Sequence, residues 1–221
     1  MYGGTVKSFT TRECKENGYE FVDLGLSVKW ATCNVGATKP EEYGDYYAWG
    51  ETETKTSYTW TNYKFRTSGD SWDNIKFSKY NTSSSYGTVD KKTVLDPEDD
   101  VAHVKWGGSW RLPTKAERDE LCDSCTWTWY NSGDTEFKGV AGYKVTSNVS
   151  GYTDRFIFLP AAGFRDDTSL YGAGEYGGYW SSSLYTDGPN GARYLGFGSS
   201  YVSTTYYGFR NDGYSVRPVC Q

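Results

Sequence analysis

Aliphatic side chains, basic clusters and long apolar runs are scarce in this 221-residue chain. No stretch of about 18 apolar residues occurs, so the sequence predicts no membrane-spanning helix. The formal net charge is −5 and no basic run occurs, which argues against binding nucleic acid through a surface that follows the phosphates. The N-terminal segment has no apolar h-region, so either the protein is not secreted by that route or a signal has been removed.

Catalytic signatures are equally sparse. His103 is the only histidine and no nucleophile elbow occurs, so neither a Ser-His-Asp nor a Cys-His arrangement can be assembled. A single histidine on a short helix is more often a surface or structural residue than a general base. No GxGxxG or Walker pattern supports nucleotide binding. The sequence therefore predicts a protein that is not an enzyme and has no cofactor.

Redox and metal sites also lack support. Cys122 and Cys125 have CxxC spacing, but neither a thioredoxin-like setting nor a second pair of zinc ligands lies nearby. Five cysteines allow at most two disulfides, and this odd count does not settle the compartment. The acidic runs PEEYGDYY, DPEDD and RDDTS do not match the ligand spacing of an EF-hand loop. We therefore predict no metal site.

Aromatic residues, in contrast, make up 18% of the chain. Each buried Tyr or Trp removes about 150–250 Å² from water, so these residues can supply a core that the aliphatic residues cannot. An aromatic content this high also argues against disorder, despite the polar average composition. We expect a folded domain with an aromatic core.

Two short helices and many short strands are predicted. Asp96 is a candidate N-cap, with Pro97 at the first helical position, and Thr114 forms a capping box with Glu117. After Cys125 the chain is rich in strand and turn patterns, and RFIFLPAAG, its most hydrophobic run, is the best candidate for a central strand. This order predicts an α+β fold with several antiparallel strands and long irregular loops.

The organisation is that of one domain with an N-terminal extension. We assign residues 1–18 to the extension and residues 19–221 to the domain. Residues 66–90 are rich in Ser and Asn and predict a long irregular surface excursion, but they are too aromatic to be a flexible linker.

Five strings in a fixed order carry a resemblance to a known family. They are WATCNVGATKPEEYGDYYAWGE, LDPEDDVAHVKWGGSWRLPTKAE, FIFLPAAGFR, GYWSSS and SVRPVC. Together they resemble the variable proteins of bacterial and phage diversity-generating retroelements, which have a C-type-lectin-like fold. The resemblance extends from about Tyr19 to Cys220. It implies that the first and last strands, in SVKWATC and SVRPVC, pair with each other.

The resemblance also implies a diversified segment near the C-terminus, at about residues 185–214. In such proteins, adenines of a template are randomised during copying, so that an AAC codon never becomes Lys, Glu, Gln, Met or Trp. None of these five residue types occurs at residues 185–214. Leu195, Phe197 and Val202 would then be fixed framework residues. The implied ligand-binding residues are Tyr185, Gly188, Asn190, Gly191, Arg193, Tyr194, Gly196, Gly198, Ser200, Tyr201, Ser203, Thr205, Tyr206, Tyr207, Phe209, Asn211, Asp212 and Tyr214.

Physical chemistry independently favours a binding surface in this segment. In YLGFGS, the period of two directs Leu195 and Phe197 to the core and leaves Gly196 and Gly198 outward. Tyr offers a large and rather rigid contact area, while Gly and Ser offer room and adaptable hydrogen bonding, as in antibody paratopes. We expect exposed Tyr and Phe side chains to bind a protein or another macromolecule, with Arg193 and Asp212 adding charge selectivity. The alternative is a purely structural role, in which this segment is a glycine-rich loop whose tyrosines cover the core.

Two other functions remain open. One is a carbohydrate-binding module of the same fold, in which Tyr and Trp rings stack on sugars. The GPN and RND tripeptides are a poor match to a calcium-dependent sugar motif. The other is an enzyme related to the formylglycine-generating group, which would need two close thiols such as Cys122 and Cys125. The resemblance implies an extracellular or surface-displayed location, on a cell or a phage particle.

Overall fold

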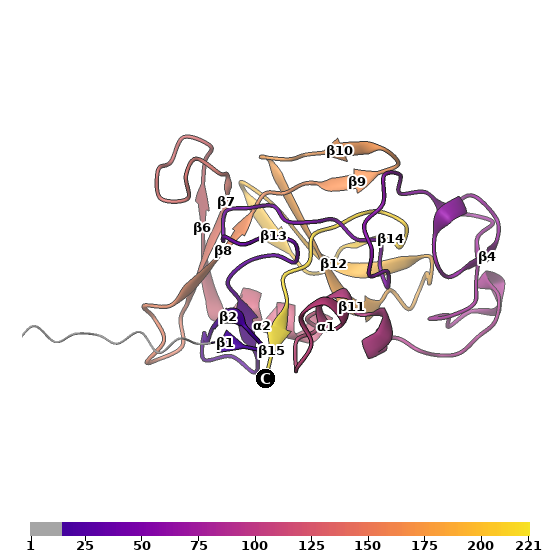
Figure 1. The fold of residues 1–221 in the computed structure, drawn as a ribbon, viewed down its shortest axis with the longest axis horizontal. Coiled ribbons are helices and arrows are strands. Elements are labelled where there is room, and N and C mark those ends of the chain that lie inside the picture. Colours follow the sequence, from indigo (N-terminus) through magenta and orange to yellow (C-terminus); the bar gives the residue numbers. More distant parts are fainter. Residues whose placement is uncertain (1–14) are drawn as a thin grey trace, which may run out of the picture.

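The computed structural model describes residues 15–221, which form mostly antiparallel strands with two α-helices (Figure 1). The prediction of two short helices among many antiparallel strands is thus confirmed. The helices are α1 (Val101–Trp106), α2 (Lys115–Ser124) and the 3-10 helices η1 (Trp60–Asn62), η2 (Ser84–Tyr86) and η3 (Pro97–Asp99). The strands are β1 (Lys15–Glu16), β2 (Tyr19–Val22), β3 (Lys29–Ala31), β4 (Arg66–Ser68), β5 (Lys76–Phe77), β6 (Cys125–Tyr130), β7 (Gly142–Ser147), β8 (Phe156–Pro160), β9 (Phe164–Asp166), β10 (Ser169–Tyr171), β11 (Tyr176–Leu184), β12 (Gly191–Gly198), β13 (Tyr201–Ser203), β14 (Tyr207–Phe209) and β15 (Val219–Cys220).

The two ends of the described chain meet in one four-stranded sheet, in the order β1-β2-β3-β15. Val219 of β15 lies opposite Trp30 of β3, so the predicted pairing of the first and last strands is confirmed. Strand β1 pairs with β2, which places residues 15–18 in the domain rather than in the predicted extension. The remainder of that extension, residues 1–14, lies outside the described residues. Figure 1 shows the C-terminus beside β1 and β2, at the opposite end from β9 and β10.

Strand β8, the predicted central strand, lies at the edge of the three-stranded sheet β6-β7-β8, so that prediction is wrong. Its side chains from Ile157 to Leu159 are nevertheless buried. The Arg217 guanidinium also donates to the Phe158 carbonyl, at 2.9 Å. The apolar run is therefore covered by side chains from other parts of the fold and not by a second neighbouring strand.

Helix α1 begins later than the sequence predicted. Asp96 caps only η3 and accepts no capping hydrogen bond, whereas the Asp100 carboxylate accepts from the backbone N–H groups of Ala102 and His103. Asp96 and Asp100 are both acceptable N-cap residues and lie four positions apart. The position of Asp100 in the tertiary structure makes it the cap of α1. Helix α2 begins as predicted, with Thr114 and Glu117 forming a capping box.

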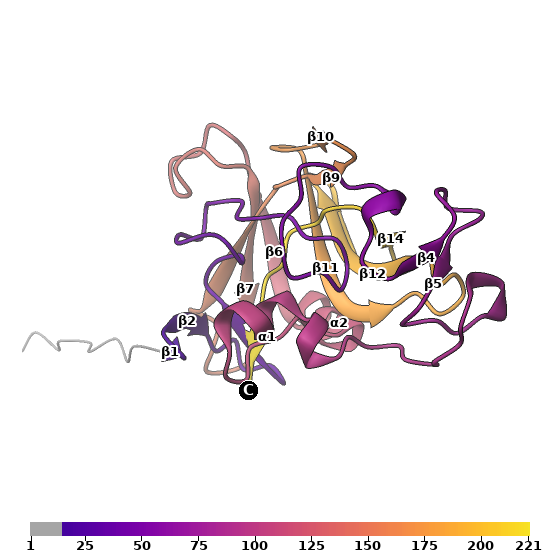
Figure 2. The same ribbon diagram turned by 45° about the vertical axis from the view of Figure 1, so that its right-hand side comes forward.

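Strands β11 and β12 separate two aromatic-rich cores. Leu195 and Phe197 face a core that also contains residues of α2, β7 and β8, while Ala192 and Tyr194 face a core that contains α1 residues and many of residues 46–80. The two strands are therefore covered on both sides, with the helices along one end of the molecule (Figure 2). This sheet continues into β13 and β14, which both pair with β12.

Residues 66–90 are only partly the surface excursion that the sequence predicted. They contain the β4–β5 hairpin, which lies to one side of the sheet near β14 (Figure 1). Phe77 and Tyr80 from this segment are fully buried in the core. The Ser- and Asn-rich sequence thus conceals aromatic anchors that fix the segment to the domain.

Candidate ligand-binding surface

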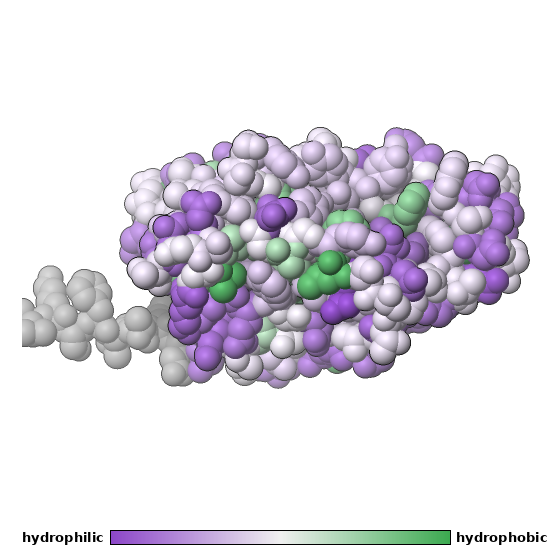
Figure 3. Space-filling view, turned by 90° about the horizontal axis from the view of Figure 1, so that it is seen from above, coloured by the Kyte–Doolittle hydropathy of each residue, from purple (hydrophilic) through white to green (hydrophobic). Residues whose placement is uncertain are grey.

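A group of aromatic side chains is exposed around β13, β14 and the loop between them. Tyr201, Tyr206, Tyr207 and Phe209 are 43%, 41%, 50% and 37% exposed. Tyr185 and Arg193 are half-buried beside them. We call these six residues the aromatic edge. Viewed from above, the molecular surface mixes pale areas of intermediate hydropathy with purple hydrophilic areas and carries a few small green patches (Figure 3).

The strand register places the aromatic edge on both sides of the sheet. Directly paired residues of antiparallel strands point to the same side, and successive residues alternate. Tyr201 pairs with Gly198, and Tyr207 pairs with Arg193. Since five positions separate the two β12 partners, Tyr201 and Tyr207 point to opposite sides. The exposed rings therefore do not share one side of the sheet, and they wrap around the sheet edge formed by β13 and β14.

Ring contacts organise the aromatic edge into two groups. Tyr206 stacks on Tyr194, with ring centroids 5.7 Å apart, and meets Tyr201 edge-on at 6.4 Å. On the other side Tyr207 stacks on Tyr185 at 4.1 Å. The Arg193 guanidinium lies 4.5 Å from the centre of the Tyr185 ring. Such packing already restricts the motion of the rings, so a bound partner would have less side-chain entropy to remove, and the entropic cost of binding is lower.

The two groups are joined through the loop between β13 and β14. The Arg193 Nη1 donates to the Thr205 carbonyl at 2.6 Å, and the Ser203 and Thr205 hydroxyls lie 2.8 Å apart. These contacts fix the loop that carries Tyr206 between the two groups of rings. The edge is therefore one connected structure, although its rings face two directions.

The structure divides the sequence-predicted binding residues by exposure. Ser200 and Thr205 are exposed with the four aromatic residues above, and Gly188 and Ser203 are half-buried with Tyr185 and Arg193. The remaining eight are buried, contrary to the expectation of an exposed surface: Asn190, Gly191, Tyr194, Gly196, Gly198, Asn211, Asp212 and Tyr214.

Gly196 and Gly198 point away from the Leu195 side as predicted, but tyrosine rings cover them. A Cβ atom on Gly196 would lie 2.8 Å from carbon atoms of both Tyr194 and Tyr206. A Cβ atom on Gly198 would lie 2.8 Å from Tyr201. The two glycines therefore provide the space in which the tyrosines lie against the sheet, and they do not themselves offer surface to a partner.

The buried amides hold the backbone of neighbouring segments. Asn190 Nδ2 donates to the Trp72 carbonyl at 3.0 Å, and Asn211 Nδ2 donates to the Tyr58 carbonyl at 3.1 Å. These are the Asn of GPN and the Asn of RND, and both amide nitrogens are bonded inside the protein, whereas the Asn211 Oδ1 is buried without a hydrogen-bond partner among the described residues. The arrangement does not favour a calcium-dependent sugar site at these positions.

Asp212 is 7% exposed, which contradicts its predicted role as a charge on the binding surface. Burial raises the pKa of its carboxyl group from 3.8 to about 8, and the nearby negative charge of Asp166 adds to the rise. At pH 7 the group is therefore largely protonated. The charge that the aromatic edge does present is the Arg193 guanidinium.

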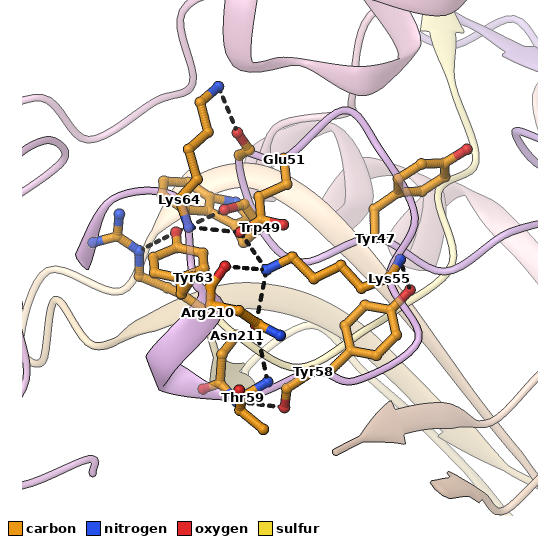
Figure 4. A network of polar contacts seen from close by, with 12 residues as sticks. Tyr47, Trp49, Glu51, Lys55, Tyr58, Thr59, Tyr63, Lys64, Arg210 and Asn211 are labelled. Atoms are coloured by element: carbon orange, nitrogen blue, oxygen red, sulfur yellow. Dashed lines mark hydrogen bonds and ion pairs between the residues drawn. The ribbon is translucent and has the colours of Figure 1, made fainter. Parts of the chain in front are cut away.

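Arg210 anchors the end of β14 to the β4–β5 segment (Figure 4). Its guanidinium is fully buried and donates to the Tyr63 hydroxyl at 2.9 Å. It also donates to the carbonyls of Tyr80, Pro189 and Lys79, and it lies 4.2 Å from the Phe77 ring centre. The aromatic edge is thus held by the aromatic anchors of residues 66–90, a link that sequence spacing could not reveal.

Neither cysteine of the CxxC pair is activated. Burial raises the pKa of the Cys122 thiol to about 12 and that of Cys125 to about 11. Helix α2 ends between them, and Cys125 begins β6. A catalytic or metal-binding thiolate needs the opposite shift.

The acidic run DPEDD brings three carboxylates together, but three lysines, Lys64, Lys79 and Lys92, pair with them. Oxygen atoms of Asp96, Glu98 and Asp99 come within 4.8 Å of one another. The Lys79 ammonium lies 2.7, 3.1 and 2.5 Å from these three residues, and Lys64 lies 2.5 Å from Asp99. The cluster is an ion-pair network in which a lysine takes the position that a cation would need.

Comparison with known proteins gives one finding. The family model described as "Domain of unknown function (DUF8237)" matches residues 129–219, less than half of the chain, from β6 through the whole aromatic edge to β15. No curated protein and no solved structure matches the chain. In residues 15–221, no helix is long and apolar enough to cross a membrane.

Sequence reasoning missed one part of the surface. Leu170 and Tyr171 of β10 are 40% and 49% exposed. Tyr171 stacks on Phe164, which stacks in turn on the buried Tyr214. This chain of rings connects β10 to the layer beneath Tyr206. The sequence does show Phe164 and Tyr171 at the two ends of a short hairpin. Only the tertiary fold, however, places these rings next to the residues of β12.

Proposed function

We propose that this chain is a non-enzymatic, receptor-like binding protein with a C-type-lectin-like fold. Its aromatic edge would be diversified by a retroelement and would bind varied macromolecular targets at a cell or phage surface. The observation that carries the proposal is the set of four aromatic side chains, 37–50% exposed, on β13, β14 and the loop between them, which pair with the largely buried strand β12. Exposed aromatic groups of this size on a rigid base are typical of interaction sites.

The division between exposed and buried residues supports diversification of a restricted set. Side chains at Tyr201, Tyr206 and Tyr207 can change with little effect on the core. Arg210 and Leu195, in contrast, are fully enclosed. A protein whose surface varies while its fold persists needs this separation. Strands β3 and β15 pair in a sheet separate from that of β13 and β14, so attachment through the sheet of β3 and β15 would leave the edge free.

A genomic comparison tests the diversification. We expect a second DNA copy of the segment encoding residues 185–214, differing mainly at adenines and lying beside a reverse transcriptase gene. The differences should concentrate at codons of the exposed residues of the aromatic edge. Absence of such a copy from the complete genome would contradict diversification by a retroelement.

Binding is tested by screening the protein against cell-surface proteins and against a glycan array. With a ligand in hand, Y201A, Y206A and Y207A should each weaken binding about fivefold or more, since a central aromatic contact contributes over about 1 kcal/mol. F156A is the matched control, because Phe156 is 38% exposed and belongs to β8 of another sheet. Equal losses in F156A and the edge variants would contradict binding at this edge.

Carbohydrate binding is the second candidate, favoured by the exposed tyrosine rings that could stack on sugars. The two functions predict different screening results. A carbohydrate-binding protein would bind glycans of the array and no cell-surface protein, and its relatives would retain the same aromatic residues. The enclosed Asn190 and Asn211 favour stacking without calcium, so chelation of calcium should leave such binding unchanged.

A further inference from the structure

Trp72 is the most exposed of the large hydrophobic side chains in residues 15–221, with 59% of its surface open to solvent. It lies in the turn between β4 and β5, outside the aromatic edge and outside residues 185–214. Tryptophan is largely buried in most proteins, because its ring carries one of the largest apolar surfaces of any side chain. A single exposed hydrophobic residue needs no explanation, so the surroundings of Trp72 decide whether it belongs to a binding surface.

The turn holds Trp72 in its exposed position. The Asn74 Oδ1 accepts from the backbone N–H groups of Asp70 and Ser71, at 2.8 and 3.0 Å. The Ile75 N–H donates to the Ser71 carbonyl at 3.0 Å, and the Ile75 side chain is only 1% exposed. The backbone on both sides of Trp72 is therefore fixed, which lowers the entropic cost of binding a partner through its ring.

The same turn adjoins the aromatic edge. The Trp72 carbonyl accepts from Asn190 Nδ2 at 3.0 Å, and the Asn190 carbonyl accepts from the Arg210 N–H at 3.0 Å. Arg210 directly follows Phe209, a member of the aromatic edge. The β4–β5 hairpin lies beside β14 in both ribbon views (Figure 1, Figure 2). Trp72 therefore continues the exposed aromatic surface beyond Phe209, toward the hairpin.

Acidic groups border the exposed indole. Asp70 and Asp73 of the turn are exposed, and their carboxylates accept hydrogen bonds from neutral groups, the Asn74 amide and the Ser71 hydroxyl. Neither carboxylate forms an ion pair with a lysine or arginine of the described residues 15–221. An apolar ring with uncompensated negative charge beside it is complementary to an apolar recess with positive charge at its rim.

We propose that Trp72 is a constant contact of the binding surface, and that its partner is a protein with an apolar recess bordered by lysine or arginine. This inference rests on the proposed function of the aromatic edge. Trp72 lies outside residues 185–214, so diversification of that segment leaves the indole in place. Tryptophan is among the residue types most enriched at energetic hot spots of interfaces. Trp72 thus supplies affinity common to all variants, and the aromatic edge supplies selectivity.

A phage-displayed library of random peptides is the probe for this contact. The library is panned on the unmodified protein, and the enriched peptides are synthesised and titrated against its variants. We expect peptides that combine apolar residues with Lys or Arg. They should bind W72A at least about 30-fold more weakly, the loss that defines a hot-spot residue, and bind F156A unchanged. W72A and the unmodified protein should have equal unfolding midpoints, because the Trp72 side chain is exposed.

The acidic border is tested with the same peptides. The double variant D70N/D73N should weaken their binding about twofold or more and reduce its dependence on salt. The control D154N, at an exposed aspartate of the loop between β7 and β8, should do neither.

The outcomes separate this inference from the proposed function. Peptides that lose affinity in Y207A but not in W72A would overturn the constant contact and leave the proposed function standing. Peptides that need Trp72 but carry no basic residue would overturn the basic rim of the partner. A library that yields no peptide would also overturn the inference, and glycan binding that W72A abolishes would then assign Trp72 to the carbohydrate alternative.

Discussion

Asp212 makes the stability of this protein depend on pH between 4 and 8. Its carboxyl group is buried beside Asp166, and its pKa is about 8 in the folded protein against 3.8 ordinarily. Because the folded state binds the proton more tightly than the unfolded state, the stabilisation is complete below pH 4. It is lost as the pH rises through 8. From pH 5 to pH 8, Asp212 should therefore lower the free energy of unfolding by about 3–4 kcal/mol.

The D212N substitution removes this titration while keeping the side chain's size. Urea denaturation at pH 5 and pH 8 measures the free energy of unfolding of both proteins. The variant should lose far less stability over this interval than the unmodified protein. Its remaining loss, about 1 kcal/mol, should come from Asp100, whose pKa burial raises to about 6.

Two aspartate variants control for general charge effects. D166N removes the neighbouring negative charge, so the pKa of Asp212 falls toward its ordinary value; the loss of stability should then end at a lower pH and be smaller between pH 5 and pH 8. D187N removes an exposed aspartate of the preceding loop and should change nothing. Equal pH dependence of D212N and the unmodified protein would refute the reasoning.

Three further predictions concern the support of the aromatic edge. R210M leaves the Tyr63 hydroxyl and three backbone carbonyls without their donor, so the free energy of unfolding measured in urea should fall by about 3 kcal/mol or more. The control R155M, at an arginine whose side chain is 41% exposed, should lower it by less than about 1 kcal/mol, and equal losses would contradict the anchoring role of Arg210. G177A places a Cβ atom 2.1 Å from the Phe197 ring and should lower the free energy of unfolding by about 1–3 kcal/mol. The control G133A, whose Cβ atom meets nothing within 4 Å, should lower it far less, and the reverse order in thermal unfolding would contradict the packing. Cys122 and Cys125 should react with iodoacetamide at pH 7.5 at least about 100-fold more slowly in the folded protein than in urea, as followed by peptide mass spectrometry, because burial keeps both thiols protonated; rapid labelling would contradict the burial.

Local patterns in the sequence predicted the local structure well. The capping box of Thr114 and Glu117, the alternation around Leu195 and Phe197, and the pairing of the first and last strands all occur in the structure. Each depends on neighbouring residues or, for the strand pairing, on a resemblance that spans the chain. The prediction of Asp96 as the cap of α1 failed because Asp100, four residues later, caps the helix instead.

The exposure of the candidate site could not be predicted in the same way. Tyr194 and Tyr206 look alike in sequence, yet one is 9% and the other 41% exposed. The difference arises because Tyr194 stands on β12, beneath the ring of Tyr206 from the following loop. Asp212 likewise looks like a surface charge in the sequence, but in the structure residues from distant segments enclose it.

The sequence by itself determined an aromatic, glycine-rich C-terminal segment on a mostly antiparallel scaffold, because composition and alternation are properties of neighbouring positions. The tertiary structure decided which of those residues meet solvent. It alone brought Arg210 among the rings of residues 63–80 and placed Trp72 beside Asn190. Such contacts join residues far apart along the chain, and the register of β12 with β13 and β14 fixes the direction of each exposed ring.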